Sequence, residues 1–132
     1  MELNLNNKTA LITGASKGIG KAIAESMANE GCNLILTARS TDKLNELKAN
    51  LQKKHNISVE VIAIDLSKKN AVEKVSDFCN EIDILINNAG AIPPGNISDI
   101  NEDTWRNAWD LKVFGYINLT RLIYNKMKDA KK

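Results

Sequence analysis

Thr13-Gly14-Ala15-Ser16-Lys17-Gly18-Ile19-Gly20 is the stretch of the sequence that decides the fold. It follows residues 8–13 (KTALIT), an apolar run typical of a buried strand, and it opens residues 17–29, whose apolar side chains have helical spacing. Glycines at such a strand-to-helix turn let a phosphate group approach the main-chain N–H groups at the start of the helix. The stretch therefore predicts a strand, a phosphate-binding turn and a helix in succession.

The same alternation of short apolar runs and segments with helical period continues along the chain. Further strands are predicted at residues 33–38 (NLILTA), 59–64 (VEVIAI) and 82–87 (IDILIN). Further helices are predicted at residues 41–54, 69–79 and, after a loop that contains two prolines, 102 to about 128. Gly115 in the last helix predicts close packing there, because glycine is otherwise unfavourable in a helix. The order predicts an α/β protein with a doubly wound parallel sheet, in one domain over residues 1–132.

Three motifs at the predicted strand ends resemble those of the short-chain dehydrogenase/reductase family. Residues 13–20 resemble its T-G-x-x-x-G-I-G signature, Asn87-Asn88-Ala89-Gly90 resembles its N-N-A-G motif, and Asp65-Leu66 resembles its adenine-binding aspartate. The resemblance covers about residues 5–125 and implies a Rossmann-type NAD(P)-binding domain with four strands in the order 3-2-1-4. It also implies that the chain corresponds to the first half of a family member and is truncated before the fifth strand.

The end of the second predicted strand distinguishes NAD from NADP. An acidic residue at this position hydrogen-bonds the free 2′-hydroxyl of NAD and repels the 2′-phosphate of NADP. This sequence has Ala38 there, followed by Arg39, whose guanidinium group can bind two phosphate oxygens at once. Lys17 in the glycine turn adds a second cation, and family members that are basic at both positions favour NADP. NADP(H) is therefore the predicted cofactor and NAD the alternative, unless both cations are ordinary surface charges.

The residues expected to bind the cofactor lie in four places. They are Gly14, Ser16, Lys17, Gly18, Ile19 and Gly20 in the turn, Arg39 and Ser40, Asp65 and Leu66, and Asn88, Ala89 and Gly90. The resemblance implies that Asp65 contacts the adenine amino group and Leu66 the face of its ring. It implies that Asn88 and Ala89 contact the adenosine-side ribose through main-chain atoms, and that Gly90 lets the main chain pass close to the cofactor. Asn87 is expected to tie the fourth strand to its neighbours.

The resemblance implies hydride transfer by a serine, a tyrosine and a lysine, and no such catalytic set is intact in the sequence. The pattern Tyr-x-x-x-Lys occurs once, at Tyr124 and Lys128, but too soon after Gly90 and with no predicted strand between. Tyr124 is therefore expected to lie at the surface. Lys112 occupies the position of the family's active-site asparagine, and unlike an amide its ammonium group can only donate hydrogen bonds. It has either a role near the nicotinamide or none.

Composition and charge exclude several classes of function. The hydrophobic content of 43% is typical of a globular protein, and the net charge of +2 is too small to predict binding to nucleic acid or an anionic membrane. No apolar run approaches the ~20 residues of a membrane-spanning helix, and the start of the chain lacks a signal-peptide pattern, which predicts a cytoplasmic location. Cys32 and Cys79 are expected to be buried and reduced, and His55 alone predicts no metal site.

Three functions are compatible with these observations. The first is the NADP(H)-binding module of an oxidoreductase, a fragment or truncated product whose family acts on carbonyl or alcohol substrates. The second is a cofactor-binding or regulatory partner that pairs with a full-length dehydrogenase through residues 105–127. The third is a flavodoxin-like protein that binds FMN, which leaves the N-N-A-G motif unexplained. The apolar fourth strand would have an unpaired edge, so we expect marginal stability and self-association. The substrate is not predicted.

Overall fold

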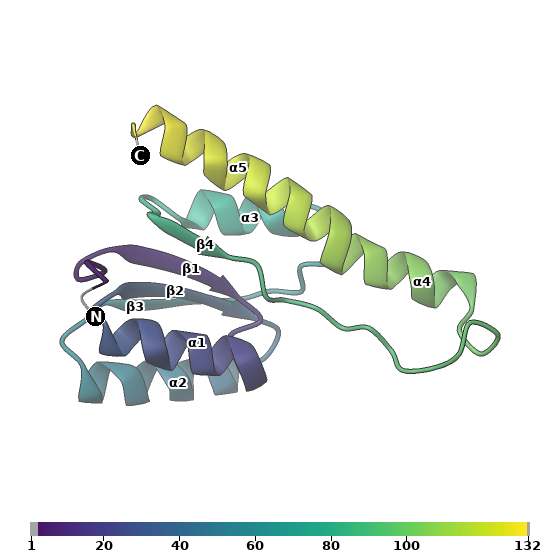
Figure 1. Ribbon diagram of the computed structural model, residues 1–132, viewed down its shortest axis with the longest axis horizontal. Coiled ribbons are helices and arrows are strands. Elements are labelled where there is room, and N and C mark those ends of the chain that lie inside the picture. The colour runs from purple at the N-terminus through teal and green to yellow at the C-terminus, as the bar shows by residue number, and fades with distance from the viewer. Residues whose placement is uncertain (1–2, 132) are drawn as a thin grey trace.

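The computed structural model describes residues 3–131 and shows a four-stranded parallel sheet between two layers of helices (Figure 1). The strands are β1 (Thr9–Thr13), β2 (Asn33–Ala38), β3 (Val59–Ala63) and β4 (Ile84–Ile86). The helices are α1 (Gly18–Asn29), α2 (Thr41–Lys54), α3 (Ala71–Phe78), α4 (Glu102–Trp109) and α5 (Gly115–Asp129), with a π-helical turn, η1 (Asp110–Phe114), between the last two. The strand order is β3-β2-β1-β4, so the doubly wound fold and the order 3-2-1-4 are confirmed.

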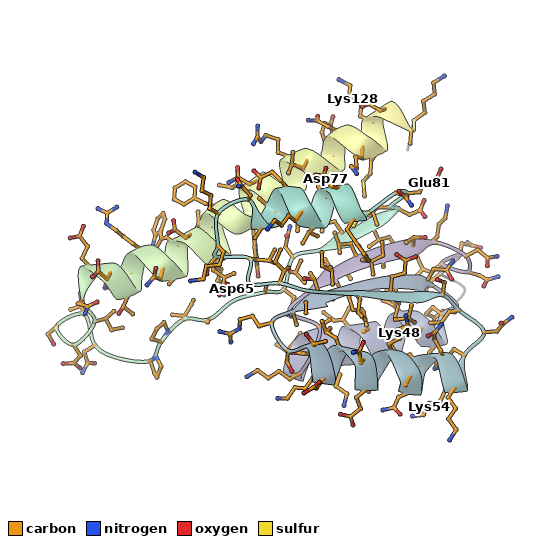
Figure 2. All side chains as sticks on the ribbon, turned by 180° about the vertical axis from the view of Figure 1, so that it is seen from behind. Lys48, Lys54, Asp65, Asp77, Glu81 and Lys128 are labelled. Atoms are coloured by element: carbon orange, nitrogen blue, oxygen red, sulfur yellow. The ribbon has the colours of Figure 1, made fainter. Side chains whose placement is uncertain are left out.

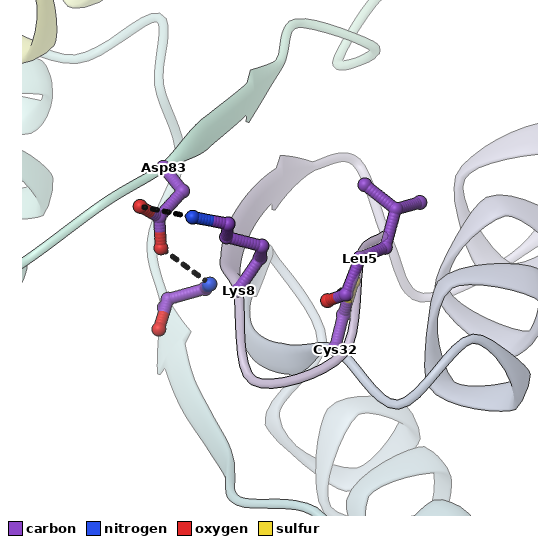
Figure 3. Close-up of polar contacts among 5 residues, drawn as sticks. Leu5, Lys8, Cys32 and Asp83 are labelled. Atoms are coloured by element: carbon purple, nitrogen blue, oxygen red, sulfur yellow. Dashed lines mark hydrogen bonds and ion pairs between the residues drawn. The ribbon is translucent and has the colours of Figure 1, made fainter. Parts of the chain in front are cut away.

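The register of the sheet brings the carboxyl ends of the strands to one edge. All three strand pairs are parallel, with Thr13 opposite Thr37 and Ile12 opposite Ile86. At the other edge, the Asp83 carboxylate accepts a hydrogen bond from the Thr9 N–H at 2.9 Å and lies 3.9 Å from the Lys8 ammonium group (Figure 3). This contact joins the amino ends of β1 and β4. The loops that follow the strands lie at the opposite edge, where a site can form at the carboxyl ends.

Each face of the sheet has its own apolar core. Ile12 and Leu36 belong to the core between the sheet and α1 and α2, whereas Leu11 and Ile35 belong to the core on the face that α3 and α5 cover. Figure 1 shows these helices on the two faces of the sheet. Successive residues of a strand point to opposite faces, so a strand buried on both sides reads as a continuous apolar run. All four side chains are at most 6% exposed, and burial of one such side chain stabilises the fold by about 1.5–3 kcal/mol.

The fourth strand is shorter than predicted. The sequence indicates a strand at residues 82–87, but only Ile84–Ile86 have strand geometry. Within the described part of the chain β4 pairs with β1 alone, and its three residues are only half-buried. A strand with one neighbour has hydrogen bonds on one side only, so its ends are less constrained than those of β1 or β2.

The long final helix differs from the prediction in one respect. It is interrupted by the π-helical turn η1, which fits an additional residue into the helix. A Cβ atom on Gly115 would lie 3.3 Å from the carbonyl oxygen of Asp110. The close packing predicted at Gly115 is therefore contact with the wider turn of its own helix, and not with another element.

The apolar face of this helix is also less buried than the sequence predicts. The sequence predicts a wide apolar face, but the structure buries only Leu119, Ile123 and Gly115 of α5 and leaves other large apolar side chains exposed. The exposed ones are Trp105, Trp109, Phe114, Ile117 and Tyr124. None of the helices described in residues 3–131 is long and apolar enough to cross a membrane.

The basic residues between 126 and 132 predict a solvated helix end, but Lys126 differs from this prediction because its ammonium group has partners in the fold. Its ammonium group donates hydrogen bonds to the carbonyl oxygens of Ser76, at 2.5 Å, and Cys79, at 2.7 Å. Both oxygens lie at the carboxyl end of α3, where a helix presents unpaired carbonyl groups and favours a cation. Lys126 thus fastens α5 to α3. Cys79 and Cys32 are buried free thiols, as predicted, and the Cys32 thiol donates to the Leu5 carbonyl oxygen at 3.2 Å (Figure 3).

Candidate functional site

A pocket of about 970 Å³ lies at the carboxyl ends of the strands. All the residues predicted to contact a cofactor line this pocket, except Gly20. They are Gly14, Ser16, Lys17, Gly18, Ile19, Arg39, Ser40, Asp65, Leu66, Asn88, Ala89 and Gly90. The residues come from the loops after all four strands, which the parallel register brings together. In open α/β sheets this edge is where ligands bind.

The three glycines of the turn have different tasks. A Cβ atom on Gly14 would lie 2.9 Å from the Cα atom of Ala89, and one on Gly20 would overlap the carbonyl oxygen of Gly14. Gly14 and Gly20 are therefore needed for the turn to pack against itself and against the segment after β4. Only at Gly18, with φ of 55°, would a Cβ atom meet nothing within 4 Å. Gly18 begins α1, so it is the glycine whose main chain is open to a ligand.

The loop after β4 is fixed to the end of β1. The Thr13 hydroxyl accepts hydrogen bonds from the N–H groups of Asn88 and Ala89, both at 2.9 Å. The Asn88 side-chain amide donates to the carbonyl oxygens of Thr13, at 3.1 Å, and Gly14, at 3.2 Å. The two main-chain N–H groups already have partners, so only the carbonyl oxygens of Asn88 and Ala89 are left to contact a ribose. Thr13 holds the site together, a role that the sequence analysis did not give it.

Asn87 ties the end of β4 to a neighbouring element, as expected. Its side-chain amide donates to the hydroxyl of Thr120 at 2.9 Å. Thr120 belongs to α5, so Asn87 ties the end of β4 to a helix rather than to a neighbouring strand.

Asp65 lies where the strands end, on the side of the long helix (Figure 2). Its Oδ1 atom accepts hydrogen bonds from the N–H of Ser67, at 3.0 Å, and from the Ser67 hydroxyl, at 2.7 Å. These bonds lower the pKa of the Asp65 carboxyl group, partial burial opposes them, and the positive charges of Lys68 and Arg39 lower it further. Asp65 is therefore an ionised acceptor held in a fixed orientation by the turn that follows it.

Three cations gather at the end of the pocket near β2. Lys17 and Arg39 were predicted, and the structure adds Lys43. Lys43 also lines an adjoining hollow of about 310 Å³, together with Lys17 and Lys21. The Ser40 hydroxyl caps α2 by accepting a hydrogen bond from the Lys43 N–H at 3.4 Å, which places Lys43 in the first turn of the helix. In the sequence, Lys43 could have been identified from its position about one helical turn after Arg39.

One wall of the pocket comes from the long helix and was not predicted. Its residues are Thr104, Asn107, Ala108 and Leu111, which follow one another at helical spacing. They lie on the side of the helix that faces the strand ends, and no motif marks them. Identifying them requires the orientation of the helix relative to the sheet.

The two residues that resembled parts of a catalytic set lie in different places. Tyr124 is 61% exposed on α5 and does not line the pocket, in agreement with its expected surface position. Lys112, in the π-helical turn, lies beside the pocket. A Cβ atom on Gly90 would be 3.5 Å from the Cδ atom of Lys112.

The sequence matches the short chain dehydrogenase family over residues 8–132. An uncharacterised oxidoreductase of Bacillus subtilis, YvaG, is 36% identical over 132 residues, which are 99% of this chain and 50% of that protein. The very-long-chain 3-oxoacyl-CoA reductase of Mus musculus is 33% identical over 93% of this chain and 41% of its own length. The chain thus spans about half the length of the relatives that it matches.

Among solved structures, too, the chain is similar to about half the length of the proteins that it matches. The L-sorbose reductase of Gluconobacter frateurii, complexed with NADPH and L-sorbose, superposes with a TM-score of 0.93 at 34% identity and covers 98% of this chain and 51% of its own. A short-chain dehydrogenase of Sphingobium yanoikuyae, in complex with NADPH, superposes with a TM-score of 0.88 at 30% identity and covers 93% of this chain and 50% of its own. The described part of this chain therefore has the fold of about half of each of these proteins.

Proposed function

The chain belongs to the short-chain dehydrogenase family, and on this premise we propose that it is the cofactor-binding part of an oxidoreductase and binds NADP(H) in preference to NAD(H). The observation that carries the proposal is the gathering of Lys17, Arg39 and Lys43 at the end of the pocket where β2 ends. An acidic residue at that strand end would select NAD, and here the position holds Ala38.

The pocket fits a dinucleotide in both shape and chemistry. Gly18 leaves its main chain open at the start of α1, where a helix favours a diphosphate. Asp65 and Leu66 on one side, and the wall formed by the long helix on the other, would hold the adenine ring. Arg39 and the two lysines would hold the phosphorylated ribose. When bound, NADPH would supply the hydride that reduces a carbonyl group, and NADP would accept one from an alcohol.

The charges near the β2 end determine how strong the preference would be. Arg39 and Lys43 are exposed, so part of their attraction for a phosphate is lost to solvent and salt. If each contact with the 2′-phosphate contributes about 1–2 kcal/mol, NADPH binds at least ten times more tightly than NADH. Asp65 is close enough for Arg39 to lower its pKa, so the phosphate and Asp65 would compete for the guanidinium group.

We also propose that these residues bind the cofactor without turning over substrate on their own. Tyr124 is outside the pocket, and Lys112 stands where the family has its active-site asparagine.

The two cores share one sheet, which supports a single cofactor-binding domain. A flavodoxin-like role loses its support, because the N-N-A-G segment is an integral part of the pocket.

A specific observation favours a second candidate, the pairing of this chain with a related dehydrogenase. Trp109, Phe114 and Ile117 are each more than half exposed along the last helix. Exposed apolar side chains gathered in this way mark sites of protein interaction. In this reading the chain keeps its cofactor pocket and uses the helix to bind a longer relative.

Fluorescence titration with NADPH and NADH tests the main proposal. We expect saturable binding of both, with NADPH at least tenfold tighter. Equal affinities would contradict the NADP preference. Failure to bind either dinucleotide at millimolar concentration, while circular dichroism shows a folded protein, would contradict the cofactor-binding function itself. Co-purification with a full-length dehydrogenase would support the second candidate.

A further inference from the structure

The Lys112 side chain lies along the main chain of Gly90. A Cβ atom on Gly90 would be 3.5 Å from Cδ and 3.9 Å from Cε of Lys112, which is ordinary van der Waals contact. Gly90 itself lines the pocket and Lys112 does not, so the methylene groups of Lys112 lie beside the pocket, beyond the end of β4. Long cationic side chains commonly pack their stems on other groups and keep the charged end in water.

The ammonium group of Lys112 is available to a ligand. Lys112 is exposed, and within residues 3–131 it takes part in none of the ion pairs or side-chain hydrogen bonds. Lys126 on the same long helix differs, because two carbonyl oxygens hold its ammonium group. Lys112 is also part of the π-helical turn, and such turns occur frequently at functional sites.

Arg39 and Gly90, beside which Lys112 lies, are on opposite sides of β1. Arg39 follows β2 and Gly90 follows β4, and the strand order places β1 between them. A dinucleotide with its diphosphate at the turn after β1 would extend one nucleoside toward Arg39 and the other toward Gly90. Lys112 would then meet the half of the cofactor that is the same in NADP and NAD.

We propose that Lys112 is a positioning residue for the nucleoside half of the cofactor that lies near Gly90. This inference rests on the proposed dinucleotide function. The stem of Lys112 packs on Gly90, and its positive charge attracts the cofactor from that side. Because this half carries no 2′-phosphate, Lys112 strengthens the binding of NADPH and NADH by the same factor, whereas Arg39 and Lys43 act on NADPH alone.

The test compares Lys112→Met, Lys112→Arg and the control Lys128→Met in titrations with NADPH and NADH at low ionic strength. Lys112→Met keeps an unbranched apolar stem and removes the charge, so we expect both affinities to fall about two- to fivefold with their ratio unchanged. Lys112→Arg should keep the wild-type affinities. Lys128 is exposed near the end of α5, away from the pocket, and its variant should bind as the wild type does (Figure 2). The effect of Lys112→Met should shrink at high salt.

Three results would overturn the inference. Unchanged binding of both dinucleotides by Lys112→Met would show that the charge has no role. A loss confined to NADPH would place Lys112 with the 2′-phosphate cations instead. An equal loss in Lys112→Arg would show that the fit of the stem, and not the charge, is what matters. Each result requires that the wild-type chain binds dinucleotide, so failure of the proposed function itself appears separately, as no binding by the wild type.

Discussion

Thr13 accepts two hydrogen bonds from Asn88, one at its hydroxyl and one at its carbonyl oxygen. The Asn88 N–H donates to the Thr13 hydroxyl at 2.9 Å, and the Asn88 side-chain amide donates to the Thr13 carbonyl oxygen at 3.1 Å. The Thr13 hydroxyl also accepts the N–H of Ala89. One buried hydroxyl thus satisfies two main-chain donors and sets the distance between the glycine turn and the loop after β4.

Thr13→Val should destabilise the protein by about 2–4 kcal/mol. Valine has nearly the same shape, but it leaves the N–H groups of Asn88 and Ala89 without a partner, and each unsatisfied buried group costs about 1–3 kcal/mol. The structure offers a matched control in Thr37, which is equally buried, lies opposite Thr13 and has no hydrogen-bond partner for its hydroxyl. Thr37→Val should leave stability unchanged or raise it. Urea denaturation of both variants checks this, and equal effects would contradict it.

Arg39→Ala should weaken NADPH binding about tenfold and leave NADH binding nearly unchanged, because it removes a cation that only the 2′-phosphate uses. Lys43→Met should have the same selectivity and a smaller effect. Lys54, at the far end of the same helix, provides the control (Figure 2). Lys54→Met should bind both cofactors as the wild type does. A parallel loss of NADH affinity in Arg39→Ala would contradict the assignment.

Substitutions in the glycine turn should separate folding from binding. Gly20→Ala should destabilise the fold by about 1–3 kcal/mol or more, because the added Cβ atom overlaps the Gly14 carbonyl oxygen. Gly18→Ala meets no protein atom and costs only about 1–2 kcal/mol through its positive φ. We expect it to fold and to bind dinucleotide poorly. Thermal melts and titrations distinguish the two effects, and normal binding by Gly18→Ala would contradict the diphosphate site.

Stability should fall as the pH rises from about 9 to about 11, in part because of Cys79. Burial raises the pKa of the Cys79 thiol from 9.0 to about 11, although the charge of Lys126 opposes this. In this range the unfolded chain releases the thiol proton and the folded chain keeps it, so deprotonation favours unfolding. The contribution reaches roughly 2–3 kcal/mol. Urea titrations across this range should show a smaller decrease for Cys79→Ala. Equal slopes would contradict the shift.

The exposed apolar side chains of the last helix should lead to self-association. We expect the sedimentation coefficient of the wild-type chain to increase with concentration, and Trp109→Lys to reduce this increase. Trp109 is 52% exposed and lines no part of the pocket, so the substitution should leave cofactor affinity unchanged. A concentration-independent monomer in sedimentation velocity experiments would contradict the expectation.

The strands and helices could be predicted from the sequence because the apolar pattern is regular. The strands β1, β2 and β3 are rich in apolar residues, although Glu60 interrupts β3, and the bounds of β2 and α2 agree with the prediction. The β4 strand was predicted too long, because the apolar pattern extends beyond the three residues that pair with β1, although its unpaired edge was expected. The π-helical turn was missed because its residues have the same composition as an ordinary helix.

The site could be predicted where a motif follows a strand, and not where a helix packs over it. Arg39, residues 88–90 and the predicted residues of the glycine turn other than Gly20 line one pocket, and their contact with a cofactor stays a prediction. Lys43 and the wall formed by residues of α4 were not found, since their positions depend on how helices orient relative to the sheet. Two of the three glycines proved to serve internal packing, which only the distances to Ala89 and Asn88 reveal.

The bonds from Thr13 to Asn88 and Ala89 connect residues 75 and 76 positions apart in the chain. A ribosome must therefore synthesise and release the residues up to about Ala89 before the glycine turn can acquire its final shape. Until then the nascent chain has a strand, a turn and a helix with no finished pocket. Dinucleotide in the cell would thus bind only after β4 has docked, and would act as a late stabiliser of a domain whose contacts are mostly made.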